Sequence, residues 1–281
     1  MYKLLDNEID RLIEEDVPYL DLTSHLLGIG EQPARITIFT REKGIACGTE
    51  EAEKIFGKLG IQVEGKVPSG ARIHHGDILI SGTGEAGSLH MAWKIAQNVL
   101  EYASGIATKT DRLLEEARVR NPRLMILATR KNFPGTKKLA MKGIISGGAL
   151  PHRLGVSESV LVFRNHLNIL GGLEGFLERL EDIRTLACEK KIIVETSDLE
   201  EAGLLAAAGV HGIQLDKVIF QEVREKLAAL KVRYPGLTVL VAGGINDKNA
   251  ESYSDPNVDG IVTSSLYYGK PLDLGCRIEP L

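Results

Sequence analysis

The feature that most constrains the fold is a regular alternation of short apolar runs and helical stretches in the second part of the chain. The runs read as buried strands, and helical patterns such as 173–187 and 218–230 separate most of them. The apolar runs lie at 124–128, 160–163, 192–195, 212–215, 238–242 and 260–262. Strands that alternate with helices pair in parallel through right-handed crossovers, so the pattern predicts either a doubly wound sheet or a barrel.

Polar residues at the carboxyl ends of these runs favour the barrel. Each run ends in, or is closely followed by, charged, amide or hydroxyl side chains or paired glycines. These residues are Arg130, Lys131, Arg164, Glu195, Gln214, Asp216, Gly243, Gly244, Ser264 and Ser265. A doubly wound sheet would concentrate such residues at one switch point, whereas a barrel collects them around one rim. We therefore predict an α/β barrel whose site lies at that rim.

The first 108 residues lack this rhythm and predict a separate domain. Their apolar positions indicate a helix at 9–13, a half-buried strand at 35–39, a helix at 51–59 and a short strand at 78–80. This mixture is typical of a compact α+β layer.

Two helical patterns mark the end of this first domain. One long helix is expected from Leu89, and a second helix is expected over 110–118. We therefore place an N-terminal domain at 1–108 and a barrel domain at 109–265, and we expect the tail at 266–281 to return to the first domain.

Composition limits the class of protein. The chain has 281 residues, of which 43% are hydrophobic, and a formal net charge of -4. These values allow a sizeable core and argue against a general nucleic-acid binder, so any anion site must be local. Cys47, Cys188 and Cys276 form no C-x-x-C motif, which predicts reduced, metal-free thiols. No signal-peptide pattern and no apolar run of about 18 residues occurs, so we expect a cytoplasmic protein without a membrane partner.

The strongest chemical signal is a group of cations after the first barrel strand. Arg130 and Lys131 directly follow the run at 124–128, and His152 and Arg153 come about twenty residues later. Clustered cations on loops beyond a strand end suit a ligand with several negative charges, such as a phosphate or a di-acid. Solvated surface charge is the alternative interpretation.

Two later loops are typical of a phosphate site. Gly243 and Gly244 end a strand and are expected to open a helix, whose first N–H groups bind phosphate readily. Ser264 and Ser265 follow the next strand and add hydroxyl and amide donors. The alternative for the glycine pair is a tight turn that needs glycine for steric reasons.

Single carboxylates end two adjacent predicted strands. Glu195 and Asp216 are hard oxygen ligands next to the predicted phosphate loops, a combination that suits Mg²⁺ held jointly by protein and substrate. Acids at strand ends also cap the following helix, and Asp216 could do so alone.

Two other motifs carry little weight. The segment 82–87 spells G-x-G-x-x-G, but no strand ending in an acid returns after about twenty residues, so we favour a glycine-rich turn over a dinucleotide site. His74 and His75 lack the i, i+4 spacing of a helical metal pair.

Taken together, these residues make the chain similar to the type II phosphoribosyltransferases. This is the family of quinolinate phosphoribosyltransferase, or nicotinate-nucleotide pyrophosphorylase, and the chain most resembles its ModD-type pyrophosphorylases, which are linked to molybdate transport. The resemblance extends over nearly the whole length. The motifs that carry it lie at 21–23, 97–98, 104–108, 129–131, 134–135, 147–148, 152–155, 165–166, 195, 199–202, 215–216 and 243–245.

The resemblance implies an N-terminal α/β sandwich domain followed by an open seven-stranded α/β barrel. It also implies a homodimer in which the partner's sandwich domain completes each active site. The implied reaction is attack of a pyridine nitrogen on C1 of phosphoribosyl pyrophosphate, release of pyrophosphate, and loss of the ring's 2-carboxylate. An enzyme that catalyses such a displacement must orient the nucleophile and neutralise the leaving pyrophosphate, and it needs these more than covalent catalysis.

The resemblance also implies roles for individual residues, which fall into three groups. The residues implied to hold the acid substrate or the phosphoribosyl oxygens are Arg130, Lys131, His152 and Arg153. Those implied to serve Mg²⁺ and the ribose are Glu195 and Asp216. Those implied to grip the 5-phosphate are Gly243, Gly244, Ser264 and Ser265.

Three positions depart from the family pattern. The family's Lys-Asp-Asn-His reads Phe163-Arg164-Asn165-His166, and its Leu-Glu-Lys-Tyr-Ala reads Leu139-Ala140-Met141-Lys142-Gly143. The arginine expected from the partner subunit is Lys94. An aromatic ring in place of a cation favours a flatter or less charged acceptor than quinolinate. Arg164 is a candidate to supply the missing charge.

Two other functions remain open from the sequence. A barrel lyase could use Lys131 as a Schiff base, with Arg130 lowering its pKa. A non-catalytic sensor could bind a phosphorylated metabolite and report to a transporter. The phosphoribosyltransferase hypothesis accounts for more of the rim, and it leaves the acceptor heteroaromatic acid unnamed.

Overall fold

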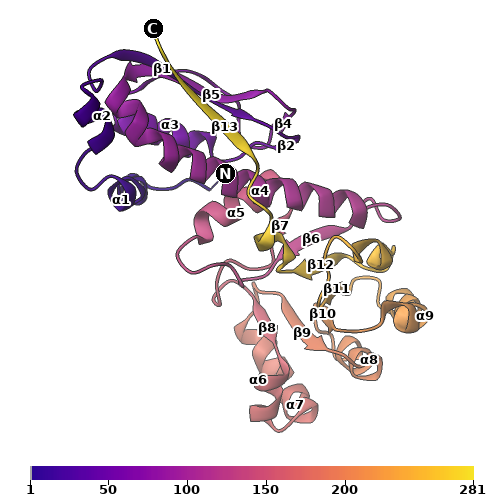
Figure 1. Ribbon diagram of the computed structural model, residues 1–281. Coiled ribbons are helices and arrows are strands. Elements are labelled where there is room, and N and C mark those ends of the chain that lie inside the picture. The colour runs from indigo at the N-terminus through magenta and orange to yellow at the C-terminus, as the bar shows by residue number, and fades with distance from the viewer. Residues whose placement is uncertain (1) are drawn as a thin grey trace. The chain divides into compact units, whose positions relative to one another are not determined.

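The computed structural model describes residues 2–281 and contains two compact units with separate sheets (Figure 1). The first unit comprises the residues up to Asp111 together with Asn132–Ala149 and Leu266–Leu281. The second comprises Arg112–Lys131 and Leu150–Ser265. The segment Asn132–Ala149 therefore lies with the first unit, whereas the sequence had placed it in the barrel domain.

Buried polar contacts explain why this segment lies in the first unit. It contains helix α5 (Lys137–Ser146), and Lys142 of α5 donates hydrogen bonds to Glu50 and Glu51 of α3 (Thr49–Lys58). The Cys47 thiol donates to the Ser146 hydroxyl at 3.4 Å. Periodicity predicts a helix, but it does not show which body of the protein the helix packs against.

The first unit combines an antiparallel sheet with helices. Its remaining elements are α1 (Asp6–Asp16), α2 (Leu22–Leu27), β1 (Pro33–Thr40), β2 (Gly44–Ile45), β3 (Gln62–Lys66), β4 (Arg72–Ile73), β5 (Ile78–Glu85), most of α4 (Ala86–Ala117) and β13 (Leu274–Pro280). The main sheet has the order β13-β1-β5-β3. Along β1, buried and more exposed residues alternate, and Ile36 and Ile38 join a core with α3 and α4. The alternation predicted at 35–39 is thus confirmed.

Helix α4 is one continuous helix of 32 residues, so the prediction of two successive helices was wrong. Ser104 and Gly105, which suggested a break, lie inside it. Gly105 is needed there for close packing, since an added Cβ would lie 2.3 Å from the backbone oxygen of Lys270 in the same unit. A glycine in a helical pattern can therefore mark a close approach rather than an end.

The G-x-G-x-x-G motif is part of this antiparallel layer. Gly82 and Gly84 lie within β5, and Gly87 lies in the first turn of α4. The interpretation of this motif as a glycine-rich turn was therefore wrong. A dinucleotide site is also excluded, because β5 pairs antiparallel with β1 and β3 and belongs to no parallel βαβ unit.

The second unit alternates strands and helices as the sequence predicted. Its elements are β6 (Met125–Ala128), β7 (Leu150–Pro151), β8 (Val160–Val162), α6 (Arg164–Leu170), α7 (Leu173–Leu186), β9 (Ile192–Thr196), α8 (Leu199–Ala207), β10 (Gly212–Asp216), α9 (Phe220–Arg233), β11 (Thr238–Ala242), the 3₁₀ helix η1 (Ala250–Tyr253) and β12 (Gly260–Thr263). A second 3₁₀ helix, η2 (Ser265–Tyr268), follows β12. All six predicted strands are confirmed within one or two residues.

The seven strands form one parallel sheet with the order β7-β6-β12-β11-β10-β9-β8. The seventh strand, β7, has only two residues, which is too short to produce an apolar run in the sequence. The inner face carries a small apolar cluster built on Leu161, Ile193, Leu240, Ala242 and Val262. This confirms the open α/β barrel.

No helix among residues 2–281 is both long and apolar enough to cross a membrane.

Candidate active site

Two carboxylates lie next to each other at the carboxyl ends of β9 and β10. Glu195 pairs in register with Gln214, whose Nε2 donates a hydrogen bond to Glu195 Oε2 at 2.6 Å. Asp216 lies two residues beyond Gln214, so the side chains of Gln214 and Asp216 extend from the same face of β10. Burial and the charge of Asp216 raise the pKa of Glu195, against the opposing effects of Gln214 and of the Lys131 and Lys217 charges. The pair is therefore a site of net negative field.

Neither carboxylate caps a helix. The N-cap of α8 is Asp198, whose side chain accepts from the Glu200 amide, and the N-cap of α9 is Ile219. The helix-cap alternative for Asp216 was therefore wrong. The nearest cation to Asp216 is the exposed Lys217, with Nζ 3.9 Å from Oδ2.

Two arginines and a histidine gather at the ends of β6 and β7. Arg130 follows β6 and is exposed, while Arg153 follows β7 and is buried. The His152 amide donates to the Ala128 carbonyl at 2.9 Å, which fixes His152 beside the end of β6. Burial and then the Arg153 charge lower the pKa of His152, and burial and then the Arg130 charge lower the pKa of Arg153. The group is therefore a site of net positive field.

The two edges of the sheet approach each other at this rim. Strands β7 and β8 lie at opposite ends of the strand order, yet the Arg153 guanidinium, which follows β7, is 5.7 Å from the centre of the Phe163 ring, which follows β8. Phe163 in turn stacks on His166 at 5.8 Å. The sheet therefore curls enough for the long Arg153 side chain beyond one edge strand to reach a residue beyond the other, although β7 and β8 do not pair. The aromatic ring takes part in the cationic side of the rim.

Arg164 is paired with Glu201 of α8 and not with the cationic group at the rim. Its guanidinium donates to both oxygens of Glu201, at 3.2 and 2.9 Å, and Glu201 also accepts from the Thr196 hydroxyl at 2.6 Å. This pairing holds Arg164 against α8. It gives no support to the idea that Arg164 replaces the cation lost at position 163.

The loop after β11 contains the paired glycines. Gly243 and Gly244 have φ values of +97° and +71°, and an added Cβ on Gly243 would lie 2.6 Å from the Lys217 amide nitrogen. The tight turn therefore requires glycine. No helix opens at this pair, because the next helix is η1, a four-residue 3₁₀ segment that begins at Ala250. The predicted helix amino terminus was wrong, and only the amides of the turn remain as donors.

The loop after β12 is fastened to this turn. The Thr263 hydroxyl donates to the Ile245 carbonyl at 2.6 Å and lies 3.1 Å from the Ser265 hydroxyl, while the Ser265 amide donates to the Thr263 hydroxyl. Ser264 and Ser265 are both half-buried. The two loops predicted to bind phosphate thus lie side by side and are held by a buried hydroxyl.

Lys94, Cys47 and Cys276 belong to the first unit, and Cys188 lies between α7 and β9 of the second. Lys94 is an exposed residue of α4 in the first unit, and its Nζ is 4.3 Å from the centre of the Trp93 ring. Cys47, Cys188 and Cys276 are all free thiols, and burial raises the pKa of both Cys47 and Cys276 to about 11.

Gln214 is the site residue whose importance the sequence did not reveal. It was recognised as a polar residue near a strand end, but only the strand register shows that its amide reaches Glu195. Lys217 is a second such residue, since its charge acts on Glu195 and its backbone packs against Gly243.

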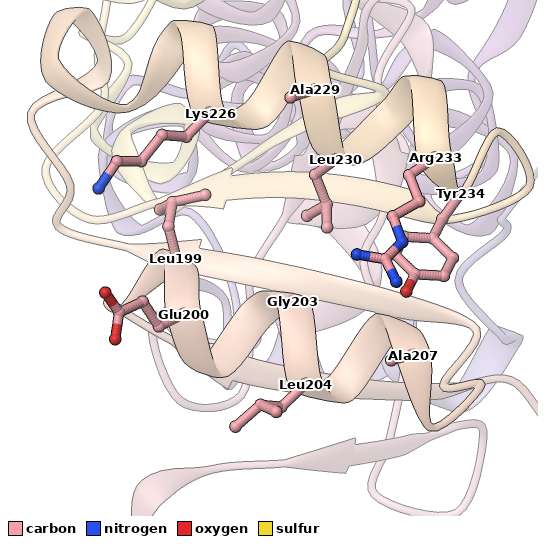
Figure 2. A pocket seen from close by; sticks show the side chains of 10 residues that line it. All are labelled: Leu199, Glu200, Gly203, Leu204, Ala207, Lys226, Ala229, Leu230, Arg233 and Tyr234. Carbon is pink, nitrogen blue, oxygen red and sulfur yellow. The ribbon is translucent and has the colours of Figure 1, made fainter.

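A shallow groove lies between α8 and α9 on the outer side of the barrel (Figure 2). It contains none of the predicted site residues. Small and apolar side chains form most of it, with Lys226, Arg233 and Glu200 at its edges.

Family models match both parts of the chain. The model of the quinolinate phosphoribosyl transferase C-terminal domain matches residues 106–277, and the model of the N-terminal domain of the same enzyme matches residues 21–104. The chain belongs to the quinolinate phosphoribosyl transferase family. This places it among the type II phosphoribosyltransferases and confirms the resemblance inferred from the motifs.

Curated relatives divide this family into two groups. ModD of Pasteurella multocida, whose name describes it as a pyrophosphorylase, is 36% identical over 274 residues, covering 98% of this chain and 97% of the relative. The human carboxylating nicotinate-nucleotide pyrophosphorylase is 28% identical over 271 residues, covering 96% and 90%.

Solved structures of the family share the fold. NadC from Streptococcus pyogenes superposes with a TM-score of 0.89 at 23% identity and covers all of both chains. The nicotinate-nucleotide pyrophosphorylase from Francisella tularensis superposes with a TM-score of 0.89 at 22% identity, covering 99% of this chain and 98% of that one.

Proposed function

We propose that this member of the quinolinate phosphoribosyl transferase family transfers the phosphoribosyl group of phosphoribosyl pyrophosphate to the ring nitrogen of a heteroaromatic acid. The observation that supports this most strongly is the division of one barrel rim into a cationic side at β6 and β7 and an anionic side at β9 and β10. An acid acceptor needs the first, and a sugar with a bound divalent cation needs the second.

Mg²⁺ is the cofactor that suits the anionic side. Mg²⁺ is usually held by one or two carboxylates together with substrate phosphates, and Glu195 and Asp216 provide two carboxylates that raise each other's energy when both are charged. Among residues 2–281 no group of three or more His, Cys, Asp and Glu side chains could hold a metal. The substrate would therefore complete the coordination, and the bound ion would neutralise pyrophosphate as it leaves.

The chain's own residues would orient the two reactants. Arg130 and Arg153 bind the carboxylate of the acceptor, and His152 donates one hydrogen bond as a neutral imidazole, because its pKa is lowered by burial and by Arg153. The ring nitrogen then attacks C1 of the ribose, and the bond from C1 to the pyrophosphate oxygen breaks with its electron pair. The charge of Lys131 acts on Glu195, and this lysine would meet the phosphoribosyl oxygens. Positioning of this kind can supply much of the rate enhancement.

The 5-phosphate would bind at the two linked loops. The turn amides of Gly243 and Gly244 and the hydroxyls of Ser264 and Ser265 are donors on adjacent strands β11 and β12. The space around the Cβ position of Gly244 is open to 4 Å, so a ligand oxygen can approach its backbone.

The acceptor would carry less negative charge than quinolinate. Position 163, 5.7 Å from the Arg153 guanidinium, is occupied by the ring of phenylalanine rather than by a further cation, and Arg164 is paired with Glu201. A single carboxylate on a flat ring suits a guanidinium beside an aromatic face.

We also propose a cytoplasmic homodimer with shared active sites. Lys94 stands where the family has an arginine that reaches the partner's site, and it is exposed. Mixing an inactive Lys94→Ala chain with an inactive Arg130→Ala chain should restore part of the activity, because each mixed dimer can contain one intact site. A monomer by light scattering, or no recovery after confirmed subunit exchange, would contradict this.

The deciding experiment measures thermal stability with phosphoribosyl pyrophosphate and Mg²⁺. A ligand that binds only the native state raises stability, by about 2.7 kcal/mol at one hundred times Kd. No change in Tm at millimolar ligand would overturn the proposal. A pyrophosphate-release screen across pyridine, pyrimidine and purine acids would then identify the acceptor. A Schiff-base lyase would be trapped by borohydride with a carbonyl substrate, and a sensor would release no pyrophosphate, but the comparisons support neither.

A further inference from the structure

Gln214 is a polar side chain in an apolar part of the barrel interior. It is 4% exposed, and it pairs in register with Leu240 of β11 on one side and Glu195 of β9 on the other. The same inner face carries Leu240 and Ile193 in its apolar cluster. A buried amide is costly in such surroundings unless both of its ends are hydrogen-bonded.

Only one end of this amide is hydrogen-bonded. Nε2 of Gln214 donates to Glu195 Oε2 at 2.6 Å, whereas Oε1 is buried and has no partner among the described residues. A side chain that served packing alone would be apolar here. The energetic cost of the unpaired oxygen therefore points to a use for the paired nitrogen.

Gln214 is also the only hydrogen-bond donor that reaches Glu195 within residues 2–281. It fixes one carboxylate oxygen, Oε2, and leaves the other oxygen for a ligand. The donor is neutral, so it orients the carboxylate without cancelling its charge, as an arginine or a lysine in the same place would do.

We propose that Gln214 is a positioning residue for the phosphoribosyl donor: its amide holds Glu195 beside Asp216 with one oxygen free for the ribose or its bound cation. The inference rests on the proposed function and adds to it a residue that touches neither reactant. Gln214 lies two residues before Asp216 on the same face of β10. Its bond to Glu195 therefore fixes that carboxylate relative to the strand that carries Asp216.

This role predicts different effects on stability and on ligand binding. Replacing Gln214 with leucine or methionine removes the unpaired oxygen and adds an apolar side chain beside Leu240. These gains offset the lost bond to Glu195, which is only partly buried and can turn to solvent, so Tm without ligand should stay the same or rise. The same change frees Glu195 to rotate, so the affinity for phosphoribosyl pyrophosphate with Mg²⁺ should fall about tenfold. A merely structural residue would lose both together.

The experiment measures Tm without ligand, and Kd for phosphoribosyl pyrophosphate with Mg²⁺ by calorimetry, in the parent, Gln214→Leu and Gln214→Met. Thr196→Val is the matched control. It removes the hydroxyl of a buried residue next to Glu195, and that hydroxyl donates to Glu201 and not to Glu195. The control should lower Tm and leave Kd unchanged. A double-mutant cycle with Glu195→Gln adds a test of mechanism, since Gln214→Leu should have no further effect on Kd in that background.

Each outcome decides the proposal. Parental binding that persists unchanged in both Gln214 variants would overturn the inference and leave the proposed function intact. Absence of binding by the parent would overturn both. An equal loss of affinity in the presence and absence of Glu195 would show that Gln214 does not act through it. Failure of both variants to fold would show that the amide serves the fold itself, which would also overturn the inference.

Discussion

Each unit contains a cluster of charges, one buried beneath α3 and α5 and one at the barrel rim, and the clusters differ in how their charges are compensated. In the first unit, Lys142 is 1% exposed and is enclosed by Glu50 and Glu51, with Nζ 2.6 Å from Glu50 Oε2. Glu50 also accepts two hydrogen bonds from Ser69. Burial disfavours the charged form of Glu50, yet the bonds from Lys142 and Ser69 outweigh it and lower its pKa to about 2.

The barrel rim shows the reverse arrangement. Arg130 lies close enough to Arg153, and Asp216 close enough to Glu195, for like charges to act on each other. With burial, this raises the pKa of Glu195 and lowers the pKa values of His152 and Arg153. The opposing charges are those of Lys131 and of the exposed Lys217, whose Nζ is 3.9 Å from Asp216 Oδ2. In the first cluster every charge has a partner within the protein. At the rim the opposing cations only partly offset the repulsion, which is the arrangement expected of a charge cluster that binds a ligand rather than one that holds a fold.

The largest expected effect breaks the compensated cluster. Lys142→Met leaves two carboxylates without their cation, so the free energy of unfolding should fall by about 3–5 kcal/mol. Urea denaturation measures this. The control is Lys138→Met, which removes a half-exposed salt bridge to Glu8 and should cost less than about 1 kcal/mol. Equal losses in the two variants would remove the distinction between the clusters.

The next effect concerns the uncompensated carboxylates. Glu195→Gln and Asp216→Asn should each weaken the binding of phosphoribosyl pyrophosphate with Mg²⁺ on the order of ten- to a hundredfold. Stability without ligand should stay the same or rise, because each change relieves repulsion. Calorimetry and thermal unfolding give the two quantities, with exposed Glu200→Gln on α8 as the control. If the two variants lost stability without ligand but kept the parental affinity, these carboxylates would serve the fold, like those of the first cluster.

A third change adds a charge to the cationic side. Phe163→Lys should improve kcat/KM for quinolinate on the order of ten- to a hundredfold by providing a charged hydrogen bond for a second carboxylate. Arg164→Ala should change this value little, because Arg164 already pairs with Glu201. Efficient parental turnover that collapses in Arg164→Ala would show that Arg164 leaves Glu201 to bind the substrate.

The smallest effect is a pH dependence of the compensated cluster. The pKa of Glu50 is lowered from 4.5 to about 2 in the folded state, so its contribution to stability is present above about pH 4.5 and is lost as the pH falls toward 2. The loss should be about 1–2 kcal/mol, reduced because the side chain is 27% exposed. The free energy of unfolding, measured by denaturation at several pH values between 2 and about 6, should vary less with pH in Glu50→Gln than in the parent. The same pH dependence in both proteins would assign the acid sensitivity to other groups.

The sequence predicted those parts of the fold that depend on local pattern. The barrel strands, their polar ends and the motifs of the family are all readable, because a strand buried on both faces is continuously apolar. The two-residue strand β7 and the position of α5 were missed, since neither produces a local signal. Gly105 was misread as a helix end because its role inside α4 is to let the backbone of Lys270, far away in the sequence, approach closely.

The site follows the same rule. Glu195 and Asp216 could be found because they end strands, and Arg130 and Arg153 because they follow them. Three features could not be found from the sequence, because each depends on register or loop geometry. They are the hydrogen bond from Gln214 to Glu195, the pairing of Arg164 with Glu201 and the short helix after Gly244. The compensation of Lys142 likewise joins residues about ninety positions apart.

The pairing of β13 with β1 has a consequence for biosynthesis. Strand β1 lies between β5 and β13, and its partners in β13 run from Leu274 to Pro280 (Figure 1). Leu274 lies 234 positions after its partner Thr40, so a nascent chain that has already made β1 must wait for all of these residues before the ribosome delivers the strand that covers this edge. Until then β1 exposes unpaired amides and carbonyls to other chains. Synthesis slowed within the barrel segment should prolong this interval and increase the demand for chaperones.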